Sequence, residues 1–338
     1  MSDRLDKTYL KRYNLSLDIF DRFDFHVRDV CPIRSVFMIS TDKGEKIFKK
    51  LDYSLEELKF IDNMISYLNK NFNRTMKFAR CRDGNIYTMY KGEVYCIIDL
   101  IRGRECDFDN PIDLKIASKG IANFHKASVG FKCDIDKRDN RGKLIDKFEV
   151  KKEEMEFFKN IANIHETKNE FDNIFLKEVD YYIDQINESI NLLKNSNYYK
   201  LSKERNKNVI CHHDLAHHNI LIKDEEAYFI DFDYSILDLK SHDLCNFITK
   251  AIKNSAFDIE KTENILNSYS KENTIDREEL KVLYAILTFP EDFYSISKNY
   301  YTKCKDWDER AFLNKLIKKC GYKEDRKEFL KYFKDNII

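Results

Sequence analysis

The residues best suited to chemistry lie in one short stretch, from 210 to 233. Asp214 precedes Asn219 by five residues, and a predicted strand–turn–strand then ends at Asp231 and Asp233. An acid can accept the proton of a hydroxyl group, and an amide oxygen with a second acid can hold magnesium on nucleotide phosphates. The spacing therefore predicts a kinase-type phosphotransferase site, with Asp214 as the catalytic base and Asn219 and Asp231 as metal ligands.

Two further residues are predicted to support the loop that carries Asp214. The His212 imidazole is expected to bond to backbone near Asp231 and fix the loop. Asp243 follows Asp231 by twelve residues on a predicted helix, where its carboxylate could accept backbone N–H groups of the same loop. A His-x-Asp sequence alone is common, whereas the combined spacing of these residues is far more restrictive.

A zinc site is the alternative interpretation of the same stretch, because four histidines and a cysteine lie close together: Cys211, His212, His213, His217 and His218. Zinc takes such ligands in proteins. However, adjacent histidines in an extended loop point apart, and no second pair of ligands stands out elsewhere. The pattern therefore favours phosphoryl transfer.

Composition excludes several classes of protein. The 59 basic residues balance the 59 acidic ones, so no overall field favours nucleic acid or an anionic membrane. No segment approaches 18 unbroken apolar residues, and the charged N-terminus lacks the apolar core of a secretory signal, so we expect neither a membrane span nor secretion. The nine cysteines never form Cys-x-x-Cys, which indicates reduced thiols and synthesis in the cytoplasm.

The first hundred residues are predicted to be rich in strands. The expected strands are 26–30, 35–40, 46–51, 85–90 and 93–100. A helix is expected between the third and fourth strands, because Ser54 and Glu57 have the spacing of a capping box. Leu58, Ile61 and Leu68 then recur on one face of that helix, with Ile65.

The remainder is predicted to be mainly helical. Asn110 and Pro111 are a cap and a first helical residue, 131–155 is expected to be a solvated charged loop running into a helix, and helices dominate again from 160 to 205 and after 238. The predicted fold is therefore α+β and bilobal, with a small nucleotide-binding lobe over residues 1–101 and a larger helical lobe with the catalytic loop over 102–338.

Two segments then indicate a family: His212-His-Asp-Leu-Ala-His-His-Asn219 and Phe229-Ile-Asp-Phe-Asp233. Together they resemble the aminoglycoside phosphotransferase and choline kinase superfamily. Segments 53–61, 102–109, 124–128 and 289–294 more narrowly resemble the CotS family of bacterial spore coat proteins. The resemblance implies a bilobal protein-kinase-like fold, ATP and magnesium as cofactors, and a small-molecule hydroxyl as phosphate acceptor. It also implies a location in the spore coat, with other coat proteins as partners.

The resemblance assigns roles in the small lobe as well. Lys49 matches the lysine that contacts nucleotide phosphates, although Lys50 stays open because a one-residue slip changes the face of a strand. Glu57 is the expected ion-pair partner of that lysine on the following helix, with Glu56 as the alternative.

Adenine is expected to contact the backbone from Asp99 to Ile101. The chain departs from the kinase pattern before Lys49, because residues 31–37 contain no glycine to let backbone approach the phosphates closely. Ser35 is the hydroxyl of that stretch that could contribute to binding.

Three functions compete on this evidence. The first is a small-molecule kinase, and the second is a structural coat component that keeps a kinase fold without significant catalysis, since a fold does not fix a function. The third is aminoglycoside phosphorylation, which needs an acidic pocket such as Glu291 and Asp292 would help to form. Six aromatic residues are candidates either for an acceptor pocket or for the core: Phe289, Phe293, Tyr294, Tyr300, Tyr301 and Trp307.

Overall fold

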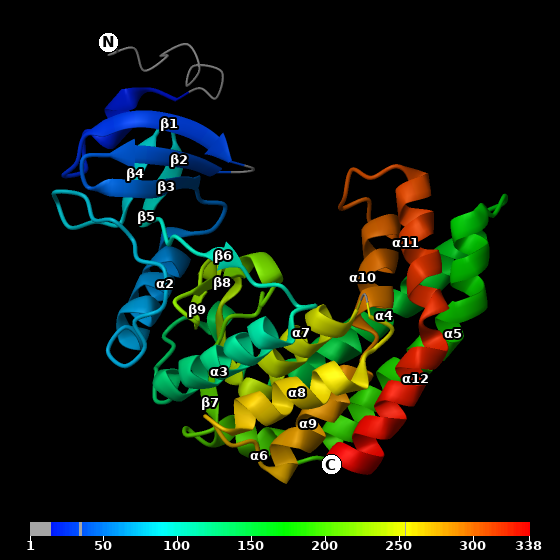
Figure 1. Cartoon of the computed structure of the whole chain (residues 1–338). Helices are drawn as coiled ribbons and strands as arrows, with labels where there is room; N and C mark the ends of the chain where they lie inside the picture. The colour runs from blue at the N-terminus through cyan, green and yellow to red at the C-terminus, as the bar shows by residue number, and fades with distance from the viewer. Residues whose placement is uncertain (1–14, 34–35, 254) are drawn as a thin grey trace.

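The computed structural model describes residues 15–33, 36–253 and 255–338. A five-stranded sheet with one helix forms one end of the molecule, and the helices that follow form the other (Figure 1). The predicted α+β class, with a strand-rich first part and a mainly helical second part, is confirmed.

The N-terminal sheet is antiparallel throughout, with the strand order β1-β2-β3-β5-β4. Its strands are β1 (Val27–Ile33), β2 (Val36–Thr41), β3 (Gly44–Lys50), β4 (Tyr87–Tyr90) and β5 (Glu93–Asp99). A short 3₁₀ segment, Leu17–Phe20, covers its outer face and packs Phe20 against Phe48 with ring centroids 5.0 Å apart. All five strands coincide closely with the segments predicted from sequence.

Alternation along β3 decides which lysine faces the rest of the molecule. Successive side chains of a strand point to opposite faces. Phe48 points into the outer core with Tyr95 and Ile97, so Lys49 points the other way, toward α2 and the helical part. Lys50 forms an exposed ion pair with Glu93 of β5, with 3.0 Å between Nζ and Oε1.

Helix α2 (Leu55–Leu68) begins with the predicted capping box. The Ser54 side chain accepts the Glu57 backbone N–H, and the Glu57 carboxylate accepts the Ser54 backbone N–H at 3.3 Å. Its predicted apolar face is buried and belongs to a core that continues into the helical part of the molecule. The first and second parts of the chain are therefore joined by shared hydrophobic packing.

Two short sheets carry the motif region. β6 (Arg104–Glu105), β8 (Ile220–Lys223) and β9 (Glu226–Phe229) form one, and β7 (Asn208–Cys211) pairs with β10 (Ile236–Leu239) in the other. In the β8–β9 hairpin, Ile220 lies opposite Phe229, and the Ile230 N–H donates to the Asn219 carbonyl at 3.1 Å. The hairpin thereby brings Asp231, the next residue, back beside Asn219.

Ten helices of the described chain follow α2, and Asn110 and Pro111 begin the first of them as predicted. Their bounds are α3 (Pro111–Ser128), α4 (Leu144–Ile164), α5 (Glu170–Lys194), α6 (Tyr198–Lys203), α7 (Lys240–Ile252), α8 (Ile259–Ser270), α9 (Arg277–Thr288), α10 (Glu291–Tyr301), α11 (Glu309–Gly321) and α12 (Lys323–Tyr332). Residues of α4, α5, α9, α10 and α11 form a second hydrophobic core. No helix in the described ranges has both the length and the apolar character needed to cross a membrane.

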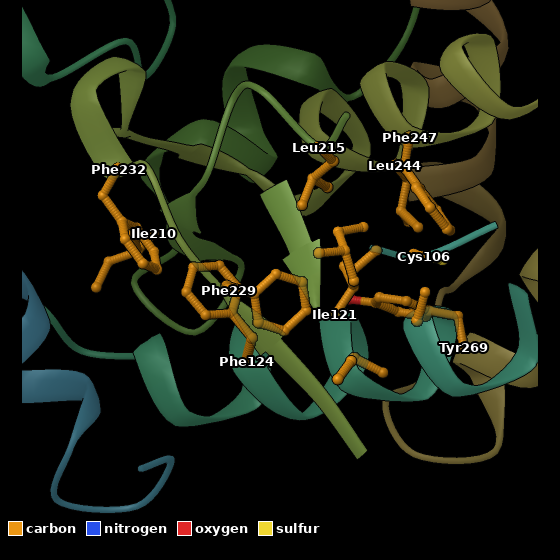
Figure 2. Close-up of a cluster of buried hydrophobic side chains, with 14 of the residues drawn as sticks. Cys106, Ile121, Phe124, Ile210, Leu215, Phe229, Phe232, Leu244, Phe247 and Tyr269 are labelled. Atoms are coloured by element: carbon orange, nitrogen blue, oxygen red, sulfur yellow. The ribbon is translucent and has the colours of Figure 1, made fainter. Parts of the chain in front are cut away.

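The core beneath the motif strands joins α3, β9, α7 and α8. Figure 2 shows Phe124 of α3 beside Phe229 of β9, and their ring centroids lie 5.6 Å apart. Leu244 and Phe247 of α7 enter the same cluster from the other side. This packing fixes the strand that leads to Asp231 against two helices.

The prediction of a solvated loop before α4 is wrong in part. Arg138 and Asn140 are buried there because Arg138 donates to the Asp233 and Ser235 carbonyls and Asn140 donates to Asp238. The proposed boundary between residues 101 and 102 falls in the connection between β5 and β6 and stays a prediction.

Gly120 of α3 offers a test of the packing that positions β9. A Cβ atom there would lie 2.6 Å from Ala227 Cβ and 3.4 Å from the Phe229 ring. Gly120→Ala should therefore lower the free energy of unfolding by about 1–3 kcal/mol, measured by urea denaturation.

Gly321→Ala in α11 is the matched control, because a Cβ atom there meets nothing within 4 Å. It should leave stability unchanged or raise it by up to about 1 kcal/mol through helix propensity. Equal behaviour of the two variants would contradict the close contact between α3 and β9.

Candidate active site

Asp214 lies on the loop between β7 and β8 and is held by two groups. The Asn219 amide Nδ2 donates to both the backbone O and the Oδ2 of Asp214, each at 2.9 Å. The Lys250 ammonium of α7 forms an ion pair with the other carboxylate oxygen. Asp214 and Asn219 therefore face the same space, as the spacing of five residues predicted.

The charge state of Asp214 follows from these contacts. Burial alone would raise the pKa of its carboxyl group, but the bond and charge of Lys250 outweigh burial and hold the pKa below its usual value. The carboxylate is thus ionised at neutral pH. In phosphoryl transfer such a group chiefly orients the acceptor hydroxyl and takes its proton as the new bond forms.

Lys49 reaches across from the N-terminal sheet to the acids that follow β9. Its Nζ lies 2.8 Å from Asp231 Oδ1 and 2.5 Å from Asp233 Oδ2, and the Tyr53 hydroxyl donates to Asp233 at 3.2 Å. Burial opposes the charge of Lys49, yet Asp233 and Asp231 together raise its pKa above the usual value. Lys49, not Lys50, is therefore the lysine that lies where the nucleotide phosphates are predicted to bind.

The backbone at Asp231 is turned to present its side chain. Asp231 has φ of 64°, and His213 of the Asp214 loop has φ of 65°. Non-glycine residues rarely occupy this left-handed region, and such strain gathers at functional sites when surrounding bonds impose it.

The donor set fits magnesium. The Asn219 Oδ1 and the second carboxylate oxygen of Asp231 accept no hydrogen bond from any described residue, and both are hard oxygen donors. Magnesium at nucleotide sites takes only one or two carboxylates and completes its shell with phosphate and water oxygens. Asn219 and Asp231 would hold the ion, as the resemblance implied.

The histidines and the cysteine considered for zinc do not converge on one point: Cys211 Sγ donates to the Leu239 carbonyl at 3.4 Å, and the His217 and His218 rings pack edge to face. His212 bonds to a carbonyl, His213 packs on His242, and His217 lies 3.5 Å from Glu105. Within the described ranges, no three His, Cys, Asp or Glu side chains are grouped so that they could hold a metal ion.

Asp243 ties the backbone of the catalytic loop to α7. Its carboxylate is fully buried and accepts the N–H groups of His212 and His213 at 2.7 and 2.8 Å, and the His125 Nε2 at 3.1 Å. Burial would raise the pKa of Asp243, but these donors, His125 first, lower it to about 2.

His212 links the two halves of the motif. Its Nε2 donates to the Ile230 carbonyl at 2.9 Å, and its Nδ1 accepts the Asp214 N–H at 3.4 Å, which fixes the tautomer. Burial lowers its pKa, so the ring is neutral. Together with the β8–β9 hairpin, this side chain ties the loop of Asp214 to the strand end at Asp231.

The expected ion pair between Lys49 and Glu57 is not formed, so that prediction is wrong. Glu57 is instead paired with Arg138 at 2.9 Å and Lys137 at 3.0 Å. Since Arg138 also donates to the Asp233 carbonyl, it connects Glu57 of α2 to the segment that follows β9. Glu56, the alternative, is exposed.

The segment predicted to contact adenine follows β5. The Asp99 N–H is bonded to the Lys77 carbonyl and its side chain to Lys46 at 2.5 Å. The N–H and C=O groups of Ile101 form no hydrogen bond within the described part of the chain. Asp99 and Ile101 line a hollow of about 340 Å³ whose lining does not include Lys49. Ser35 lies outside the described residues.

Sequence reasoning missed three residues of this site. Lys250 had a usable signal, because it follows Asp243 by seven residues and so lies on the same helix face. His125 appeared only within a family segment, and Arg138 lies in a charged stretch without periodicity.

Comparison with known proteins then decides the family. The model of the family "Spore coat putative kinase YutH" matches residues 17–333. This chain belongs to that family. The YutH-family chain is also 24% identical to "Spore coat protein S" of Bacillus subtilis (strain 168) over 323 residues, 93% of this chain and 92% of that protein. The predicted resemblance to spore coat proteins is confirmed.

Solved structures share its architecture. An aminoglycoside phosphotransferase from Alicyclobacillus acidocaldarius subsp. acidocaldarius DSM 446 is similar with a TM-score of 0.82 at 17% identity, over 96% of both chains. Spectinomycin phosphotransferase APH(9)-Ia, in complex with ADP and spectinomycin, gives 0.69 at 15% identity, over 95% of this chain and 98% of that one. At such low sequence identity these similarities show the fold alone. They confirm the predicted bilobal kinase-like fold of the YutH-family chain.

Asp243 allows a test of the loop support through pH. Asp243→Asn should cost about 2–4 kcal/mol at neutral pH, because the new amide N–H faces backbone N–H groups and leaves one of them unpaired. Asp306→Asn, at an exposed position, is the control and should cost nothing measurable.

The pH dependence has a defined sign. A carboxyl group with a pKa of about 2 in the folded state and about 3.9 unfolded stabilises fully above about pH 4 and loses that stabilisation as pH falls toward 2. The wild type should therefore lose about 1 kcal/mol more than Asp243→Asn by about pH 3, measured by chemical denaturation. A constant difference between the two proteins would remove Asp243 from this role.

Proposed function

We propose that this protein binds Mg·ATP where the N-terminal sheet meets the helical part, and transfers the γ-phosphoryl group to a hydroxyl group of a small molecule. The observation that carries the proposal is the convergence of Lys49 from β3 with Asp231 and Asp233, beside the Asp214–Asn219 pair. These five side chains come from three separate segments, and the functional groups of Mg·ATP phosphotransfer are the ones that they supply.

The residues have distinct roles in the proposed reaction. Asp214 orients the acceptor hydroxyl and takes its proton as the new P–O bond forms, while the bond to ADP breaks and ADP leaves with the electron pair. Lys49 binds the nucleotide phosphates, and Asn219 and Asp231 hold the magnesium. The ion, when bound, neutralises charge on the phosphate oxygens.

The proposed contacts with adenine are made by backbone groups. The N–H and C=O of Ile101, which have no hydrogen-bond partner among the described residues, offer one donor and one acceptor, which is what an adenine edge needs for recognition. The structure of APH(9)-Ia with ADP supports nucleotide binding by this fold. We therefore assign the connection between β5 and β6 to the base.

Membership of a spore coat family supports a place for this protein in the coat, in contact with other coat proteins. A coat component without turnover is the second candidate function. The tests below separate the two, because nucleotide binding and phosphate transfer are measured independently.

Lys49 and Lys50 form a matched pair for testing nucleotide binding. Lys49→Met should weaken Mg·ATP binding roughly 10- to 100-fold in titration calorimetry, because a charge-assisted bond to phosphate is lost. Lys50→Met removes the same charge from the opposite face of β3 and should leave the affinity within about twofold. Equal effects of the two substitutions would contradict the assignment.

Asp214 tests the chemical step. Asp214→Asn should slow phosphate release from Mg·ATP by roughly 10²- to 10⁴-fold, because the proton acceptor is lost, while the Kd for Mg·ATP stays unchanged. Asp306→Asn is the control for a lost surface charge. Wild-type protein that binds Mg·ATP but releases no phosphate would favour the coat component without catalysis.

A further inference from the structure

The helical part contains a cavity that opens beside Asp214. Its volume is about 560 Å³, within the range of small-molecule sites. Lys250, which is paired with Asp214, and His213, the residue before Asp214, both line it. Asp214 itself is not part of the lining, so a molecule that contacts Lys250 and His213 is separated from the proposed catalytic base by those side chains alone.

The apolar walls suit a compact organic molecule. Phe148 of α4 and Phe289 stack with centroids 4.1 Å apart, and Tyr182 and Phe293 stack at 3.8 Å. His213 is neutral, because burial lowers its pKa to about 3, so it offers a hydrogen-bonding ring without charge. Of the aromatic residues considered from sequence, Phe289 and Phe293 line the cavity and also belong to the second hydrophobic core, as Tyr294 and Tyr300 do.

The charged groups of the lining are unbalanced. Six basic side chains line the cavity, against two acidic ones, Glu291 and Asp292. The basic residues are Lys147, Lys151, Lys250, Lys253, Lys319 and Arg326. Lys151 pairs with Glu291 at 2.6 Å, Lys319 with Asp292, and Lys250 with Asp214 outside the lining.

Three cations are left without a carboxylate among the described residues. Lys147 donates to the Asn140 side chain, and Arg326 donates to Gln185 at 3.0 Å and to two backbone carbonyls. The Lys253 ammonium has no hydrogen-bond or ion-pair partner in the described part of the chain. The free carbonyl groups at the C-terminal end of α7 carry about half a negative charge near Lys253. The three cations therefore still leave the cavity with a net positive charge.

The excess is concentrated at one end of the cavity. Asp292 forms an ion pair with Lys319, and its negative charge also acts on Lys253 and Arg326. One carboxylate therefore balances three cations only in part. Burial lowers the pKa of Lys253 and of Arg326, although the charge of Asp292 acts in the opposite direction. Lys253 stands one turn of α7 beyond Lys250, about 5 Å along the helix axis.

We propose that this cavity binds the phosphate acceptor and that the acceptor is an anionic hydroxy compound. Its hydroxyl group contacts Asp214, and its carboxylate or phosphate group contacts Lys253 and Arg326 roughly one helical turn away. The acceptor role rests on the proposed function. The same charges disfavour a polycationic aminoglycoside, because Glu291 and Asp292 are already paired with lysines.

Four glucose-related sugars of similar shape and different charge test the proposal: D-glucuronate, D-glucose 6-phosphate, D-glucose and D-glucosamine. Binding is measured by titration calorimetry on the full chain, with and without saturating Mg·AMP-PNP, which keeps the sugars out of the nucleotide site. We expect at least one anionic sugar to bind roughly tenfold more tightly than glucose, and glucosamine to bind no better than glucose. The stronger of the two anions identifies carboxylate or phosphate as the preferred group.

Lys253→Gln should weaken binding of that anionic sugar roughly fivefold, whereas Lys115→Gln, at an exposed position of α3 outside the cavity, should leave it unchanged. Lys253→Glu should shift the preference toward glucosamine. Lys253 is chosen because Arg326 is buried and its loss could unfold the protein.

The proposal is overturned if glucosamine or glucose binds as tightly as both anions, or if Lys253→Gln leaves anion affinity unchanged. Failure of Mg·AMP-PNP to bind the wild type would count against the proposed function alone, because the titrations without nucleotide report the charge preference of the cavity separately.

Discussion

The geometry of the catalytic loop depends on one buried carboxylate. Asp243 accepts two successive backbone N–H groups, those of His212 and His213, and so imposes the left-handed conformation of His213 on the loop. A chain of donors behind it, from Asn273 through Tyr269 to His125, anchors the carboxylate in turn. A fully satisfied polar network of this kind is rigid, because each missing bond in a low-dielectric interior is costly.

Helix α7 connects this support to the proposed catalytic base and to the proposed acceptor cavity. Asp243 in its first turn fixes the loop, Lys250 near its end holds Asp214, and Lys253 at its C-terminus lies in the cavity. Leu244 and Phe247 of the same helix enter the core under β9 (Figure 2). One helix therefore relates the base, the loop and the acceptor cavity through its own regular geometry.

Local signals were enough to predict much of this arrangement. The capping box at Ser54 and the cap at Asn110 each depend on residues close in sequence, and each was recovered. The choice between Lys49 and Lys50 stayed open, because the sequence alone does not fix which face of β3 is buried. The partner of Glu57 was not predictable, because Arg138 lies in a charged segment whose burial depends on tertiary contacts with residues after Asp231. The charge of the cavity was hidden for the same reason, since its lysines come from helices distant along the chain.

In protein kinases a single ion pair between a strand lysine and a helix glutamate both positions the lysine and orients the helix. In this chain Arg138 separates these two tasks. Here Arg138 holds Glu57, so the orientation of α2 does not depend on where the Lys49 ammonium points. Lys49 can leave Asp231 and Asp233 for an incoming phosphate without releasing the helix. Under the proposed function, nucleotide binding would therefore require a side-chain rotation of Lys49 and no displacement of α2.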